Sequence, residues 1–341
     1  MSPETLTLAA EIGCESLTPL PRDVSPREYS RAIRKGEEFI LMRYPVADEK
    51  NRAELKQFLN IAAWLMENGI RAPLVFEKDM ERCHAFLEDL GDTSFGRALR
   101  EGQDRVELYT LATDVLRRLK ECQAPSYLPP FRDSRIRANI RQLVDYYAPF
   151  IRGQRLPETS IHRYLSVWTA IEQSLPPCPQ GFLHADYHLE NLMLQETGEG
   201  IERCALIDFQ DALRGPVPYD LVNLLEDARM DVPEDLQLQL IDRYCEGMNA
   251  KERQAFDLWY RVLGTQFHSR VIGLFIKLAA EQNRDEYLIH ISRLQQYLEK
   301  HLQHPVLEPL QDWFNKEGVD LSPVKELNGD AIRDIFRNLA S

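Results

Sequence analysis

The residues best suited to chemistry lie in two short segments in the middle of the chain, HADYHLENLML at 184–194 and ALIDFQDA at 205–212. The first contains the pattern H-x-D-x-x-x-x-N, and Asp208 ends an apolar stretch 22 residues after Asp186. Transfer of a phosphoryl group needs oxygen ligands for magnesium and a carboxylate that accepts a hydroxyl proton. Asp186 is the candidate base, and Asn191 and Asp208 are candidate magnesium ligands.

Each of these side chains also has an ordinary structural explanation when it is taken alone. His184 could be a buried core histidine, and Asp208 could cap the end of a strand. The combined spacing, with an apolar strand beside each motif, is what a site for phosphoryl transfer requires. We interpret the two segments as parts of one catalytic site.

The composition of the 341-residue chain narrows the possible functions. Lys and Arg number 41 against 54 Asp and Glu, and the net charge of −13 disfavours binding to nucleic acid or anionic lipid. No apolar run approaches the roughly 20 residues that span a bilayer, and the six cysteines form no C-x-x-C pair. We expect a cytoplasmic protein with reduced thiols, without nucleic-acid or membrane partners, that is a monomer or a weak dimer.

The chain is longer than the roughly 250–300 residues at which a single core stops growing, so two lobes are expected. The first shows a strand hairpin, one long helix and a second strand pair, at 29–34 with 38–43, 47–69, and 73–79 with 83–89. Helical spacing then dominates at 104–122, 135–151, 161–175, 252–282 and 285–303, with short apolar runs at 182–184 and 204–209. These patterns predict an α+β fold, with a small antiparallel-sheet lobe at 1–90 and a mostly helical lobe at 93–341.

The chain resembles the aminoglycoside phosphotransferase and choline kinase family at the two central motifs. The resemblance implies a bilobal, protein-kinase-like fold, an adenine-binding hinge at about 86–92, and the use of ATP and Mg²⁺. By position, Asp186 is similar to the family's catalytic base and His184 to the residue that braces the loop. Asn191 and Asp208 are similar to its metal ligands.

The match is weaker in the first lobe, where the nucleotide would be held. The segment 23–28 contains no glycine, so phosphate contacts would come from backbone N–H groups and the Ser25 hydroxyl. The expected third-strand lysine is replaced by Met42, which leaves the neighbouring Arg43 as a candidate phosphate ligand or a solvated surface arginine. Glu54 is the candidate acidic partner on the long helix. The hinge residues expected against the adenine are Glu88, Asp89 and Leu90.

The resemblance is sharper to one subgroup, the bacterial anomeric kinases of N-acetylmuramate and N-acetylglucosamine used in cell-wall recycling. It rests on EDLGDTSF at 88–95, the block at 208–229, and the segments 267–275 and 287–307. That subgroup also lacks the third-strand lysine. The resemblance implies transfer of the γ-phosphate of ATP to the anomeric hydroxyl of an amino sugar.

Four residues are candidates for contact with the sugar. Asp211 and Arg214 follow the proposed metal aspartate closely, and His268 and Arg270 lie on one side of a C-terminal helix, where a solvated face is an equal explanation. Asp220 is expected instead to brace the catalytic loop, as the corresponding aspartate does in this fold family.

Two other functions stay open from the sequence. An aminoglycoside or choline-like phosphotransferase would suit the acidic chain, because its substrates are cationic. A non-catalytic pseudokinase that acts as a binding module would explain the missing glycines and lysine. Such a scaffold has no physical need for Asp186, Asn191 and Asp208 together, which favours the enzyme.

Overall fold

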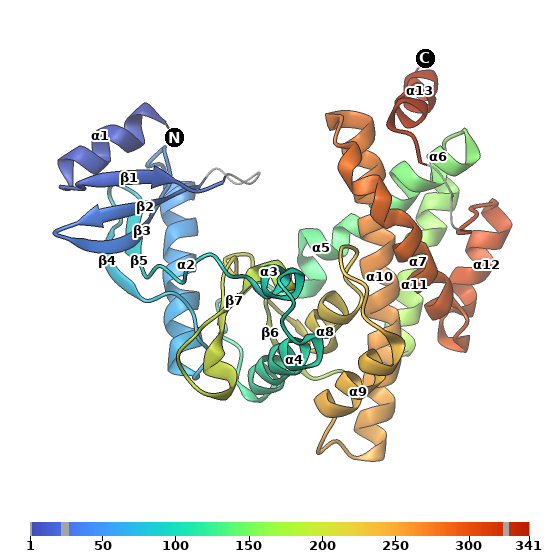
Figure 1. Ribbon diagram of the computed structural model, residues 1–341. Helices are drawn as coiled ribbons and strands as arrows, with labels where there is room; N and C mark the ends of the chain where they lie inside the picture. Colours follow the sequence, from blue (N-terminus) through green and yellow to red (C-terminus); the bar gives the residue numbers. More distant parts are fainter. Residues whose placement is uncertain (1, 22–26, 323–326, 341) are drawn as a thin grey trace. The chain divides into compact units, whose positions relative to one another are not determined.

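The computed structural model describes residues 2–21, 27–322 and 327–340 (Figure 1). It divides into a first unit, Met1–Cys122 with His188–Ala212, and a second unit, Gln123–Tyr187 with Leu213–Ser341. The first unit contains an antiparallel sheet and the second is mostly helical, so the predicted α+β fold class is confirmed. The lobe boundary expected at residues 90–93 stays a prediction.

The first unit is built on a five-stranded antiparallel sheet with the order β1-β2-β3-β5-β4. The strands are β1 Ser16–Pro19, β2 Glu28–Arg34, β3 Glu37–Arg43, β4 Val75–Asp79 and β5 His84–Leu87. The predicted hairpin is present, and its turn uses Lys35 and Gly36 at positive φ. Both predicted strand pairs are therefore confirmed.

Two helices accompany this sheet, α1 Pro3–Glu11 and the longer α2 Glu49–Glu67. The side chain of Asp48 accepts a hydrogen bond from the backbone N–H of Asn51 and so caps the start of α2. The helix buries the apolar face that its periodicity predicts, which comprises Leu55, Phe58, Leu59, Ala62 and Leu65. Gly69, at positive φ, follows its end.

The rest of the first unit comprises two α-helices and the short β7–β8 hairpin, which lies between the two candidate metal ligands in the sequence. Its elements are α3 Phe95–Arg100, α4 Arg105–Glu121, β7 Leu192–Leu194 and β8 Cys204–Leu206. The backbone N–H of Leu206 donates to Arg71 at 2.8 Å, and that of Leu194 donates to Thr93 at 2.8 Å. These bonds fix both strands of the hairpin, and Asp208 lies two residues after the second strand.

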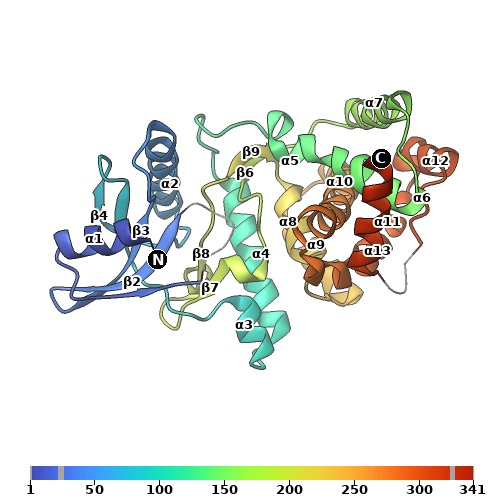
Figure 2. The same cartoon turned by 90° about the horizontal axis from the view of Figure 1, so that it is seen from above.

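The second unit surrounds α10, a buried helix of 33 residues that packs against α8, α11 and α13 (Figure 2). Its α-helices are α5 Arg135–Ala138, α6 Ala148–Arg152, α7 Glu158–Ser174, α8 Pro218–Leu225, α9 Glu234–Tyr244, α10 Ala250–Gln282, α11 Ile291–Leu302, α12 Glu308–Glu317 and α13 Gly329–Ala340. A two-stranded pair, β6 Gln180–Leu183 and β9 Leu213–Pro216, leads into and out of the functional segments. In the described ranges no helix combines the length and apolarity that crossing a membrane requires.

One predicted helix differs in detail. The segment 135–151 is not continuous: α5 is followed by a 3₁₀ turn at Asn139–Arg141, a π-helical turn at Leu143–Tyr147, and α6. The interrupted segment packs closely against α10, where a Cβ on Gly273 would collide with the backbone of Gln142. Periodicity alone cannot predict such a local widening, because it depends on the neighbouring helix.

Candidate active site

The loop after β6 carries the predicted catalytic base, and a buried aspartate accepts hydrogen bonds from its backbone. The backbone N–H groups of His184 and Ala185 donate to the two carboxylate oxygens of Asp220, at 2.6 and 3.0 Å. Ala185 has φ of 74°, a conformation unfavourable for a residue with a Cβ. The two hydrogen bonds over-determine this backbone, and Asp186, the next residue, is exposed.

Asp220 therefore braces the loop, as expected from the sequence. It is 1% exposed and lies in the first turn of α8. Burial, together with the nearby charge of Asp186, raises the pKa of Asp220 to about 7, although the two N–H donors act in the opposite direction. His184 is fully buried, and its ring meets that of Tyr187 edge-on at 5.7 Å.

The two proposed metal ligands lie in the first unit, at the same end of the β7–β8 hairpin. Leu192 pairs with Leu206, and the Ile207 N–H donates to the Asn191 carbonyl at 3.1 Å, so the residue next to Asn191 across the hairpin directly precedes Asp208. Asp208 has φ of 60°, which aspartate tolerates better than most residues. An amide and a carboxylate oxygen at one end of a hairpin fit a hard ion such as Mg²⁺.

The segment around Asp208 is fixed against α2. The Phe209 ring stacks on that of Phe58 at 5.0 Å with an angle of 18°. Gln57 donates from Nε2 to the Gln210 carbonyl at 2.8 Å, and Gln210 in turn donates to Asp208 Oδ1 at 2.8 Å. The long helix therefore orients the carboxylate through packing and two hydrogen bonds.

Arg27 is a candidate functional residue that the sequence interpretation missed. Its side chain is only 7% exposed, and Nη2 lies 3.4 Å from Asp208 Oδ1. The guanidinium also donates to the Tyr29 hydroxyl at 3.3 Å, and burial raises the pKa of Tyr29 to about 12, so this phenol stays neutral. Arg27 lies in the glycine-free segment 23–28, in which the sequence analysis proposes only Ser25 as a phosphate contact. An arginine in a predicted phosphate-binding segment is the sequence feature that could have identified it. Ser25 itself lies outside the described residues.

The other nucleotide candidates of the first unit have structural contacts of their own. Arg43 is 8% exposed and donates to Thr5 Oγ1 at 3.0 Å, on the face opposite the fully buried Met42. This contact ties β3 to α1, a helix that we did not predict. The Oε1 atom of Glu54 lies 3.8 Å from Nζ of Lys50 on the same helix.

In the expected hinge, the side chains also form ion pairs and hydrogen bonds. Glu88 pairs with Arg71 and accepts from the Leu74 N–H, while Asp89 accepts from Arg31 Nε at 2.5 Å. The Leu90 carbonyl accepts from Gln195 Nε2 at 3.2 Å. These contacts fix the course of the segment, and the adenine-binding role of its residues stays a prediction.

The four sugar candidates have different surroundings. Asp211 is exposed in the first unit, and Arg214 is exposed on β9 in the second. Arg270 Nη2 lies 3.4 Å from the Tyr219 hydroxyl. Burial raises the pKa of Tyr219, with Arg270 opposing and Asp186 adding to the shift, so both charges lie near this phenol. His268 is fully buried and contacts Glu226, which separates it from Arg270.

These features are those of a phosphotransferase. The chain matches the phosphotransferase enzyme family over residues 16–259 and belongs to it. It is an ATP-dependent kinase that transfers phosphate to an alcohol group.

Named relatives and solved structures agree with this class. An N-acetylmuramate/N-acetylglucosamine kinase of Caulobacter vibrioides is 28% identical over 326 residues, covering 86% of this chain and 90% of that protein. A kinase of the same name from Neisseria meningitidis serogroup B is 31% identical over 243 residues, covering 68% and 70%. The ADP-bound structure of aminoglycoside phosphotransferase APH(2'')-Ib is 14% identical with a TM-score of 0.57, covering 87% of this chain and 98% of that chain, and shares the fold. The family resemblance inferred from the sequence is confirmed.

Proposed function

We propose that this kinase phosphorylates the anomeric hydroxyl of N-acetylmuramate or N-acetylglucosamine to give the sugar 1-phosphate. The observation that carries the proposal is the likeness to kinases of this name along most of the chain, at 28–31% identity. The local geometry supports it, because an exposed carboxylate, Asp186, stands on a loop that Asp220 braces, and Arg270 contacts the Tyr219 hydroxyl next to that bracing residue.

In this proposal Asp186 orients the anomeric hydroxyl and accepts its proton while the γ-phosphate of ATP is transferred. An anomeric hydroxyl is more acidic than an ordinary alcohol, so a weakly basic carboxylate is sufficient. Asn191 and Asp208 would hold Mg²⁺, which neutralises phosphate charge when it is bound. Arg27 adds a fixed positive charge beside Asp208 in a chain without the third-strand lysine.

The acceptor would be recognised by hydrogen-bond donors of the second unit. Arg270 and Arg214 suit sugar hydroxyls, and either guanidinium can pair with the carboxylate that distinguishes N-acetylmuramate from N-acetylglucosamine. The same charges repel polycationic aminoglycosides. A site built to hydrogen-bond substrate hydroxyls rejects analogues that lack them by as much as ~10⁴–10⁵-fold.

A cytoplasmic monomer or weak dimer fits this activity. All six cysteines are free thiols, as expected for a reducing compartment. ATP is also available there as the phosphate donor.

A coupled ATP-consumption assay with N-acetylmuramate, N-acetylglucosamine, a kanamycin-type aminoglycoside and choline tests the proposal. We expect turnover only with the amino sugars, and phosphorus NMR should show coupling between the new phosphate and the C1 proton. Phosphate on another hydroxyl, or turnover of the aminoglycoside or choline alone, would overturn the proposed substrate and leave the kinase class intact.

A further inference from the structure

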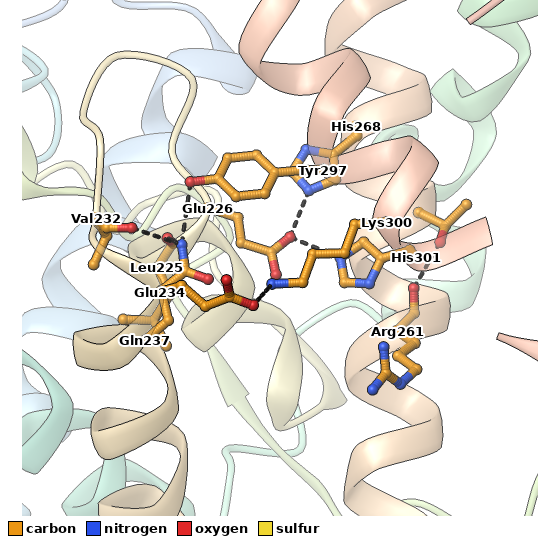
Figure 3. A network of polar contacts seen from close by, with 11 residues as sticks. Leu225, Glu226, Val232, Glu234, Gln237, Arg261, His268, Tyr297, Lys300 and His301 are labelled. Atoms are coloured by element: carbon orange, nitrogen blue, oxygen red, sulfur yellow. Dashed lines mark hydrogen bonds and ion pairs between the residues drawn. The ribbon is translucent and has the colours of Figure 1, made fainter. Parts of the chain in front are cut away.

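Three buried side chains of the second unit meet at one point although they are far apart in the sequence (Figure 3). Glu226 follows the last turn of α8, His268 lies within α10, and His301 lies near the end of α11. The Nε2 atoms of the two histidines lie 2.6 and 2.8 Å from the same oxygen, Oε2 of Glu226. Within the described part of the chain, this is the one group of three His, Cys, Asp or Glu side chains arranged to hold a metal ion.

The surrounding packing aims both rings at the carboxylate. The His268 ring stacks on Tyr297 at 5.2 Å and on His301 at 5.8 Å, each with an angle of 17°. Gly264 lies one turn before His268 on α10, and a Cβ at this position would be 2.5 Å from His301 Nε2. The absence of a side chain at residue 264 therefore makes room for the second ring.

The charge of the cluster is not balanced by an arginine or lysine. Among the described residues, Glu226 forms ion pairs only with His268 and His301, and none of these three side chains is more than 5% exposed. A buried carboxylate without a cation costs several kcal/mol. The balancing charge must come from a proton on a histidine or from a bound cation.

Both rings can present the lone pair that a metal ion needs. The Nδ1 atoms of His268 and His301 are buried without a hydrogen-bond partner in the described ranges, so no donor holds either Nδ1 as an acceptor. The ring proton can therefore sit on Nδ1 and leave the Nε2 lone pair directed at the cluster.

We propose that Glu226, His268 and His301 form a buried binding site for a divalent transition-metal ion, with Zn²⁺ as the ion that fits best. Two imidazole nitrogens and one carboxylate oxygen are ligands that Zn²⁺ takes at about 2.0–2.2 Å, and a water can complete a tetrahedron. Donor atoms on such a tetrahedron lie about 3.3 Å apart. Each Nε2 atom must therefore move away from Glu226 Oε2 by less than about 1 Å, and all three donor atoms already lie within 4.8 Å of one another. Mg²⁺, which prefers six oxygen ligands, does not suit this site.

The ion has a structural consequence for the catalytic loop. The helix α8 carries Asp220 in its first turn, and Asp220 holds the loop backbone at His184 and Ala185. Glu226 directly follows the same helix. An ion that ties Glu226 to α10 and α11 would fix the helix on which this brace stands, so metal loading should raise thermal stability.

Metal binding to the tag-free full-length protein tests the proposal. The protein is stripped with a chelator, kept in excess Mg²⁺ to saturate the oxygen-ligand site, and titrated with Co²⁺ and then Zn²⁺. We expect one ion per chain, visible Co²⁺ absorption that Zn²⁺ removes, a Kd for Zn²⁺ below about 1 μM, and a Tm rise of several degrees on loading. No stoichiometric uptake, or a stability that follows pH alone and ignores the metal, would overturn the proposal in favour of a proton-balanced cluster.

Variants locate the ion. E226Q and H301Q should weaken Zn²⁺ binding at least 100-fold, and G264A should do so without removing a ligand. H304Q is the matched control, because His304 lies three residues after His301 and its Nδ1 accepts only from the Val306 N–H in the described structure. Circular dichroism checks that each variant is folded, and E226Q and G264A keep the test valid if H301Q does not fold. Equal loss of binding in H304Q, or retained binding in both E226Q and G264A, would refute the assignment.

Discussion

The helix α8 has a buried carboxylate at each end, Asp220 in its first turn and Glu226 just after its last, and the pKa values of the two shift in opposite directions. Burial and the charge of Asp186 raise the pKa of Asp220 to about 7 despite two backbone N–H donors. Burial alone would raise the pKa of Glu226 too, but the charges and hydrogen bonds of His301 and His268 outweigh it and hold that pKa well below its ordinary value. At Asp220 the two backbone donors do not offset the effect of burial, whereas at Glu226 the two histidine partners do.

Neither buried carboxylate does the chemistry in our proposal, and the exposed Asp186 between Ala185 and Tyr187 does. D186N should lower kcat by about 10²–10⁴-fold, because it removes the acceptor for the hydroxyl proton. The affinity for Mg·ATP should change little, since in the proposed mechanism this residue contacts the sugar and not the nucleotide. Steady-state kinetics and nucleotide titration measure the two effects, and turnover near that of the wild type would assign the base elsewhere.

The brace at Asp220 should matter for activity although Asp220 itself has no chemical role in the proposed mechanism. D220N replaces one acceptor oxygen by an NH₂ group that faces a backbone N–H, so we expect a loss of about 1–3 kcal/mol in unfolding free energy. A displaced loop should also lower kcat by about 10²-fold. Urea unfolding and kinetics on the same sample separate the two losses, and unchanged kcat would show that the loop keeps its shape without the brace.

A third arrangement, a buried arginine beside a partly exposed carboxylate, occurs in the first unit at Arg27 and Asp208. R27Q should raise the KM for ATP about tenfold or more, because a hydrogen bond to a charged group is worth about 1.5–3 kcal/mol. The KM for the sugar serves as the internal control and should stay constant. A change confined to the sugar KM would remove Arg27 from the nucleotide site.

The pH dependence of stability sharpens the contrast around α8. The folded-state pKa of Asp220 is raised from 3.8 to about 7, so its protonated form favours folding, and this contribution is present below about pH 4 and lost as the pH rises to about 7. The Tm deficit of D220N relative to the wild type should therefore be largest near pH 4 and smaller near pH 7. Thermal scans across this range measure it, and a deficit that grows with pH would mean that folding favours the ionised form of Asp220.

The smallest effect is expected at Arg43. R43K should lower the unfolding free energy by about 1 kcal/mol, because it removes a hydrogen bond to Thr5 that a lysine amine does not reproduce in geometry. The KM for ATP should be unchanged. A clear rise in that KM would support the phosphate-binding role that the sequence suggested for this residue.

Much of the fold was predictable because it depends on local patterns. The hairpin of β2 and β3, the apolar face of α2 and the strands beside the two motifs follow from alternation, helical spacing and turn residues. The role of Asp220 came from the family resemblance and agrees with its hydrogen bonds. The interruptions within 135–151 did not follow, because they lie where the segment approaches Gly273 on another helix, a contact that local periodicity does not encode.

The sequence by itself determined the family and predicted the chemistry that is encoded within a few residues, namely Asp186 and Asn191 at fixed spacing and Asp208 after an apolar strand. Only the tertiary structure decided which distant side chains meet. Glu226 is 42 residues from His268 and 75 from His301, and no periodicity relates them. Their contact exists because α8, α10 and α11 pack together with Gly264 at the crossing, so a histidine expected on a substrate-facing helix surface lies instead in a buried cluster.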